Sequence, residues 1–127
     1  MHRVLIVEDN FSDIRRSEDV LKSLGVQELE LATTVAKAIE YLEDVRAGSR
    51  EAPDVIILDL NFSMESGFEV LRFWKSHPEL KNIRIVVWTV MGELEQQLCR
   101  LFGVEHVVPK WGNVAELEHI LKSAGIV

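Results

Sequence analysis

Short apolar runs alternate along this chain with longer segments that carry apolar residues at every third or fourth position. The third run, Val55–Leu58, is apolar throughout, which is typical of a parallel strand covered by helices on both faces. The longer segments have the period of amphipathic helices. The runs are Arg3–Val7, Leu29–Ala32, Val55–Leu58, Ile83–Trp88 and His106–Val108. Five strand–helix units cannot close an eight-stranded barrel, so the pattern predicts an α/β fold with an open, doubly wound parallel sheet.

Glycines and capping residues mark the ends of the expected helices. Asn10 or Ser12 is placed to cap the first helix, and Thr33 or Thr34 to cap the second. Three glycines follow helical segments, where a left-handed residue commonly ends a helix: Gly25, Gly48 and Gly103. Among the larger side chains, we expect Trp74, Trp88 and Phe102 in or near the core, and Cys99 as a small buried residue.

Composition excludes several classes of function. The 127 residues include 21 acidic and 14 basic side chains, and a net charge of −7 opposes binding to nucleic acid. Cys99 is the only cysteine, which excludes an internal disulfide and a multi-cysteine metal site. We find no signal peptide, and no apolar stretch approaches the roughly 18 residues of a membrane span. We therefore expect a single cytoplasmic domain over residues 1–127, with no output domain and no membrane or nucleic-acid partner.

Polar residues follow four of the five expected strands. Glu8 and Asp9 end the first strand, Asp59 the third and Thr89 the fourth, while the fifth runs into Lys110. Ligands of open parallel sheets bind at the carboxyl ends of the strands. We therefore expect these side chains to meet in one site.

Three carboxylates in one site repel one another. Two like charges about 4 Å apart interact unfavourably by roughly 4 kcal/mol at an effective dielectric constant of 20. Either one carboxyl group keeps a proton or cations gather there. Lys110 supplies one positive charge, and oxygen ligands favour a hard divalent cation such as Mg²⁺. Thr89 and Lys110 are donors that could hold the oxygens of a phosphoryl group.

This combination resembles the receiver domain of two-component response regulators. The matching parts are Val4–Asn10, Asp54–Leu60, Gly67, Thr89 and Lys110, and the resemblance extends over essentially the whole chain. It implies the flavodoxin-like (β/α)5 fold with strand order 2-1-3-4-5. A shorter segment, residues 75–84, is similar to stand-alone regulators that partner phytochrome-type kinases, and this match carries no residue role.

The resemblance implies a phosphoaspartate switch. Asp59 would accept a phosphoryl group from a phosphohistidine on a sensor histidine kinase or phosphotransfer protein. Asp9 and Asp59 would bind Mg²⁺ through their carboxylates, Asn61 through its backbone carbonyl, and Glu8 mainly through water. The domain would catalyse only its own phosphorylation and dephosphorylation.

The same resemblance implies how the signal is read. Lys110 would pair with Asp59 before transfer and with the phosphoryl group afterwards. Thr89 would swing toward the phosphoryl group and move the loop that follows the fourth strand. A downstream protein, or a second copy in a homodimer, would then recognise the face made by the fourth helix, fifth strand and fifth helix.

Several positions depart from the family pattern. Ser63 stands where a proline is usual, Glu65 adds a negative charge, and Val90 is bulkier than the usual small residue after Thr89. Around the lysine, the order Pro109-Lys110-Trp111 replaces Lys-Pro, and Val107 replaces an aromatic switch residue. These departures keep open a degenerate receiver that takes no phosphate and acts as an interaction module.

A third reading is a flavodoxin-like ligand-binding or catalytic domain on the same scaffold. Such a domain needs a phosphate-cradling loop after the first strand, rich in glycine, serine or threonine. Residues 8–11 here are acidic instead.

Overall fold

The computed structural model describes residues 2–62, 64–110, 114–123 and 125. Its elements follow the alternation expected from the sequence. In chain order they are β1 (Arg3–Val7), α1 (Phe11–Ser23), β2 (Glu28–Ala32), α2 (Val35–Arg46), β3 (Val55–Leu58), α3 (Phe68–Ser76), the 3₁₀ helix η1 (Pro78–Leu80), β4 (Arg84–Thr89), α4 (Glu93–Leu101), β5 (His106–Pro109) and α5 (Ala115–Ser123).

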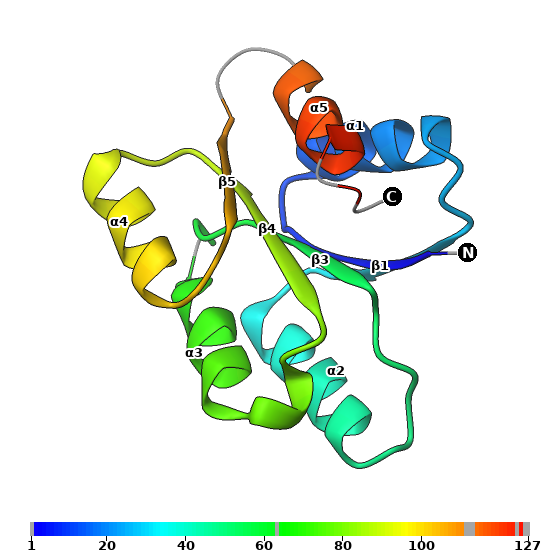
Figure 1. Ribbon diagram of the computed structural model, residues 1–127, viewed down its shortest axis with the longest axis vertical. Helices are drawn as coiled ribbons and strands as arrows, with labels where there is room; N and C mark the ends of the chain where they lie inside the picture. Colours follow the sequence, from blue (N-terminus) through cyan, green and yellow to red (C-terminus); the bar gives the residue numbers. More distant parts are fainter. Residues whose placement is uncertain (1, 63, 111–113, 124, 126–127) are drawn as a thin grey trace.

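The strands form one parallel sheet in the order β2-β1-β3-β4-β5, which confirms the predicted fold class and strand order. In Figure 1, α1 and α5 lie on one side of the sheet, and α2, α3 and α4 lie on the other. The register aligns Val7 with Leu58, and Leu58 with Val87. The carboxyl ends of the three central strands therefore lie at one edge of the sheet.

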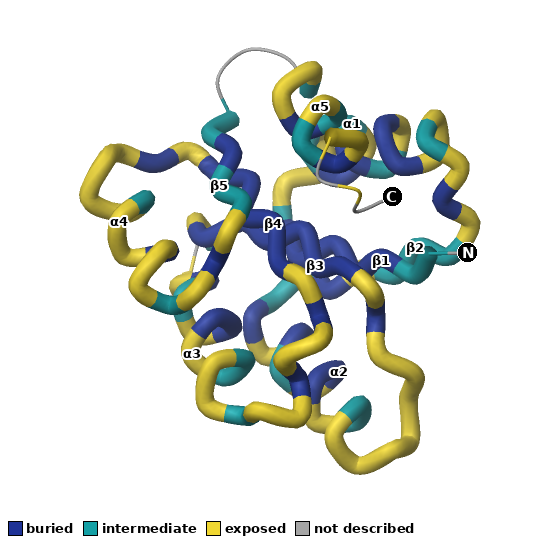
Figure 2. The backbone as a smooth tube through the Cα atoms, viewed as in Figure 1, coloured by how far each residue is buried: buried dark blue, intermediate teal, exposed yellow. Residues whose placement is uncertain are grey.

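Alternate strand residues supply two separate cores. Leu5, Ile56 and Val87 pack with the α2 and α3 side chains, whereas Ile6 and Ile57 pack with those of α1 and α5. The central strands are buried along most of their length (Figure 2). This double coverage explains why the strand sequences are continuously apolar.

The helix ends follow the expected chemistry. Asn10 caps α1 by accepting a hydrogen bond from the Asp13 N–H, and Thr34 caps α2 by accepting one from the Lys37 N–H. The three glycines expected in left-handed conformation, Gly25, Gly48 and Gly103, have φ angles of 87°, 79° and 88°.

The expected core residues are found at or near the core. Trp88 and Cys99 are buried, and Trp74 and Phe102 are partly buried against the α2–α3 side of the core. Ser63 and Trp111, which depart from the family pattern, lie outside the described residues. Among the described helices, none has the length and apolar character needed to cross a membrane.

Candidate functional site

An acidic pocket lies at the carboxyl edge of the sheet. Glu8 and Asp9 reach it from the end of β1 and Asp59 from the end of β3, and one carboxylate oxygen from each lies within 4.8 Å of the others. Glu8 and Asp59 are buried. The hollow above them has a volume of about 370 Å³ and is also lined by Asn61 and Val90. The structure thus brings together the carboxylates that the sequence analysis placed here.

Lys110 enters this pocket from the end of β5. Its ammonium lies 2.5 Å from a Glu8 oxygen, 2.9 Å from an Asp13 oxygen and 3.5 Å from an Asp59 oxygen. Its backbone N–H donates to the Thr89 carbonyl at 2.9 Å, which continues the β4–β5 pairing beyond Pro109. This backbone bond directs Lys110 to the site although the lysine is not followed by proline.

Asp13 is a site residue that the sequence analysis missed. It lies in the first turn of α1, three residues after the Asn10 cap, and pairs with both Lys110 and Arg16. A carboxylate in the first turn of a helix is usually ascribed to the helix dipole. The sequence did contain one indication that Asp13 belongs to the site, because the first turn of this helix comes directly after the acidic end of the first strand.

Trp88 lies beneath the cations of the site. The Lys110 nitrogen is 4.8 Å from the centre of the Trp88 ring, and the Arg16 guanidinium carbon is 5.4 Å from it. Both distances suit a cation–π contact. Trp88 packs into the core on the α1–α5 side, so this ring connects that core to the acidic pocket.

Thr89 and Asn61 form a hydrogen-bonded group around Asp59. The buried Thr89 hydroxyl donates to the Asp59 carboxylate. The Asn61 side-chain amide donates to the Thr89 oxygen at 3.0 Å and to the Val90 carbonyl at 2.5 Å. The Asn61 N–H donates to Asp59 at 3.1 Å. The loop after β4 is thereby joined to the expected acceptor through two side chains.

Burial determines the ionisation of the pocket. Burial raises the pKa of Glu8, a hydrogen bond shared with Asp59 also raises it, and Lys110 opposes the shift, so that the pKa of Glu8 lies at about 8. Burial lowers the pKa of Lys110, but its hydrogen bonds to Asp13 and Glu8 and the charges of Asp59 and Glu8 together outweigh this effect and leave the pKa above the usual value. Lys110 is therefore charged at neutral pH, while Glu8 tends to keep a proton. The repulsion among the three carboxylates is therefore reduced in two ways, by the proton on Glu8 and by the positive charge of Lys110.

The donor set fits a hard divalent cation. Glu8, Asp9 and Asp59 offer oxygen atoms only, as Mg²⁺ and Mn²⁺ prefer. The Asn61 side-chain amide nitrogen donates to Thr89 and Val90, and the ligand that the resemblance implies for this residue is its backbone carbonyl. The pocket can therefore concentrate positive charge around the Asp59 carboxylate.

Gly67 allows the β3–α3 loop to pack tightly against Asp59. A Cβ atom at this position would lie 2.7 Å from the Leu60 Cα and closer still to the Asp59 carbonyl oxygen. The Gly67 N–H donates to the Leu60 carbonyl at 2.9 Å. Only glycine fits this contact without moving the backbone that carries Asp59.

Comparison with known proteins identifies the family to which this fold belongs. The family described as the response regulator receiver domain matches residues 4–122. The chain belongs to this family. The response regulator Rcp1 of Synechocystis sp. is 37% identical over 90 residues, or 68% of this chain, and the match spans 60% of the length of Rcp1. The polar-differentiation response regulator DivK of Brucella anthropi is 26% identical over 121 residues and matches 94% of this chain and 93% of DivK.

Solved receiver structures have the same architecture. The phosphorylated cyanobacterial phytochrome response regulator RcpA is 31% identical, with a TM-score of 0.82 over 97% of this chain and 90% of RcpA. The Mn²⁺-bound form of Rcp1 is 28% identical, with a TM-score of 0.82 over 97% of this chain and 91% of that structure. This receiver domain therefore belongs to the two-component signalling systems.

Proposed function

We propose that this receiver is a phosphorylation-dependent switch in which Asp59 accepts a phosphoryl group from the phosphohistidine of a sensor histidine kinase or phosphotransfer protein. The observation that carries the proposal is the convergence of three groups on the buried Asp59 carboxylate: the acidic pair, the Thr89 hydroxyl and the Lys110 ammonium. The similarity to RcpA favours a phytochrome-type kinase as the partner.

In the proposed reaction, an Asp59 oxygen forms a bond to phosphorus while the bond to the histidine nitrogen breaks. The positive charge of Lys110 and the Thr89 hydroxyl stabilise the charge on the phosphoryl oxygens. Glu8, Asp9, Asp59 and the Asn61 carbonyl would hold Mg²⁺, which when bound neutralises phosphoryl charge.

The proposed signal starts at the Thr89–Asp59 hydrogen bond. A phosphoryl group on Asp59 would offer Thr89 a new acceptor, and the Asn61 amide would transmit the change to Val90 at the start of the loop before α4. Three leucines are exposed on α4, where a downstream protein or a second copy could bind: Leu94, Leu98 and Leu101. The α4–β5–α5 face is therefore the proposed output surface.

One observation favours the degenerate receiver as a second candidate. The Lys110 ammonium is closer to Glu8 and Asp13 than to Asp59. A lysine held by these two carboxylates would be less available to a phosphoryl group. The module would then act through partner binding alone.

Intact-mass measurement after incubation with Mg²⁺ and acetyl phosphate separates the two candidates. We expect the mass of one added phosphoryl group in the parent protein and no addition in Asp59→Asn. An unmodified parent that also shows no spectral change with beryllofluoride would support the degenerate module. Labelling of Asp59→Asn at the parental rate would show that another residue is the acceptor.

A further inference from the structure

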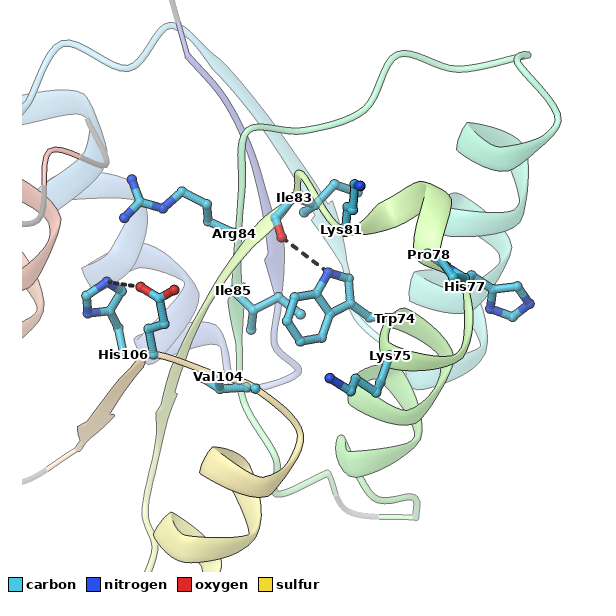
Figure 3. Close-up of a pocket in the computed structure, with 12 residues that line it drawn as sticks. Trp74, Lys75, His77, Pro78, Lys81, Ile83, Arg84, Ile85, Val104 and His106 are labelled. Atoms are coloured by element: carbon cyan, nitrogen blue, oxygen red, sulfur yellow. Dashed lines mark hydrogen bonds and ion pairs between the residues drawn. The ribbon is translucent and has the colours of Figure 1, made fainter.

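A second hollow lies at the opposite edge of the sheet from the acidic pocket. It is a groove of about 420 Å³ between α3, η1 and the turn from α4 to β5 (Figure 3). Strand β4 runs from Arg84 beside the groove to Thr89 at the acidic pocket, a length of roughly 17 Å. The volume falls within the range of about 300–1,000 Å³ that is typical of small-molecule sites.

The wall of this groove is aromatic and aliphatic. The Trp74 indole N–H donates to the Leu80 carbonyl at 3.1 Å and to the Ile83 carbonyl at 3.2 Å, which holds the ring in place. Figure 3 shows the Trp74 ring beside Ile85, with Val104 on the far side of the groove. Because the indole N–H is already bonded within the protein, the ring offers the groove an apolar surface.

Lysine side chains border the same groove. Lys75 extends from α3 toward Val104 (Figure 3), and its nitrogen lies 3.5 Å from the place that a Cβ on Gly103 would occupy. Gly103 has a φ of 88°, a backbone conformation that favours glycine, so the turn beside this ammonium carries no side chain. Lys81 lines the groove from the end of η1. Among the ion pairs of the described residues, none engages Lys75 or Lys81, although the chain carries a net charge of −7.

The other polar residues that line the groove are His77, Arg84, Glu105 and His106. Arg84 and His106 leave the sheet on the side opposite to Trp74 (Figure 3), as alternation along a strand requires. Glu105 lies 3.9 Å from His106, and its side chain is mostly exposed. The His77 ring packs on Phe73 and contacts the Phe73 carbonyl. The Trp74 wall and the Lys75 ammonium therefore define the chemistry of the groove.

We propose that this groove binds a small organic anion with an aromatic body, whose ring packs on Trp74 and whose acid group pairs with Lys75. A neutral apolar ligand would cover Lys75 without supplying a countercharge, which is unfavourable. An inorganic anion would leave the apolar wall uncovered. A ligand with both an aromatic ring and an acid group would cover the Trp74 wall and also supply a countercharge to Lys75.

Titration of the full chain with 1-anilinonaphthalene-8-sulfonate, a fluorescent aromatic anion, tests this proposal. We expect saturable binding that weakens about tenfold in Lys75→Glu, because an attractive ion pair becomes a repulsive one. Lys22→Glu is the matched control, since Lys22 occupies the last turn of α1 as Lys75 occupies that of α3. Lys75→Met removes the charge but keeps an apolar chain, and should give a smaller loss. Neutral N-phenyl-1-naphthylamine should be insensitive to Lys75→Glu.

Amide and indole NMR shifts locate the bound probe. We expect the largest shifts at the Trp74 indole and the Gly103 amide, with unchanged affinity in Asp59→Asn. Because Asp59→Asn lacks the proposed phosphoryl acceptor, binding of the probe to this variant tests the groove independently of the proposed phosphorylation. Shifts confined to the exposed leucines of α4, or an equal loss of binding in Lys22→Glu, would overturn the proposal, as would binding that never saturates.

Discussion

Substitution of Gly67 by alanine tests how closely the β3–α3 loop must pack against the expected acceptor. The backbone of Gly67 has φ −63° and ψ −15°, so alanine adds no conformational strain. The added methyl group would lie 2.7 Å from the Leu60 Cα and closer still to the Asp59 carbonyl oxygen. Carbon atoms pack best at about 3.5–4.0 Å, so the backbone at residues 59 and 60 must move by about 1 Å.

Two opposing terms set the size of the effect. Overpacking costs about 1–3 kcal/mol, whereas replacing glycine by alanine stabilises by about 0.4–1 kcal/mol through the unfolded state. We expect the steric term to dominate and the free energy of unfolding to fall by about 1–2 kcal/mol. A displacement of about 1 Å at a reacting group can also slow chemistry about 10²-fold, so labelling of Asp59 should slow strongly.

Urea unfolding and the rate of labelling by acetyl phosphate measure these two effects. Gly92→Ala is the matched control, because Gly92 precedes α4 as Gly67 precedes α3 and also has a negative φ. Its new methyl group would meet only the flexible Glu95 side chain, at 3.1 Å. If Gly67→Ala kept the stability and labelling rate of the parent, or if Gly92→Ala lost as much, the packing argument would be wrong.

Three further predictions concern the site, the core and a helix cap. Lys110→Ala should slow labelling about 10²-fold, the usual loss when a transition-state donor is removed, while Mg²⁺ binding stays largely intact; equal labelling would place Lys110 outside the reaction. Burial raises the pKa of the Cys99 thiol to about 11, and the charge of Glu95 adds to it. At pH 8 only about one thiol in a thousand is then ionised. Ellman's reagent should therefore react slowly with Cys99 until urea unfolds the chain or the pH nears 11. Rapid reaction of the folded protein at pH 8 would contradict the burial of this thiol. Thr34→Ala should lower the free energy of unfolding by about 1 kcal/mol, measured by urea unfolding, whereas Thr33→Ala should change it by less than about 0.5 kcal/mol; equal losses would refute the cap assignment.

Local pattern was sufficient to predict the strands, since the expected strands agree with the observed ones to within one residue at either end, whereas the strand order came from the family resemblance. For example, Ile83–Trp88 was expected and Arg84–Thr89 is observed. Pattern alone left two capping candidates for each of the first two helices. The structure selects Asn10 over Ser12 and Thr34 over Thr33, because these two residues have the extended backbone of an N-cap and accept a hydrogen bond from the N–H three residues on.

The sequence by itself determined which polar groups reach the carboxyl edge of the sheet. Glu8, Asp9, Asp59 and Thr89 each follow an apolar strand, and parallel strands with aligned ends carry such residues to one edge. Tertiary structure alone decided what surrounds Lys110: the Asp13 carboxylate from α1 and the Trp88 ring from β4. It also created the Trp74–Lys75 groove, which needs α3 and the turn before β5 to meet. These contacts join residues distant along the chain, so they depend on how helices pack across the sheet, which local periodicity does not encode.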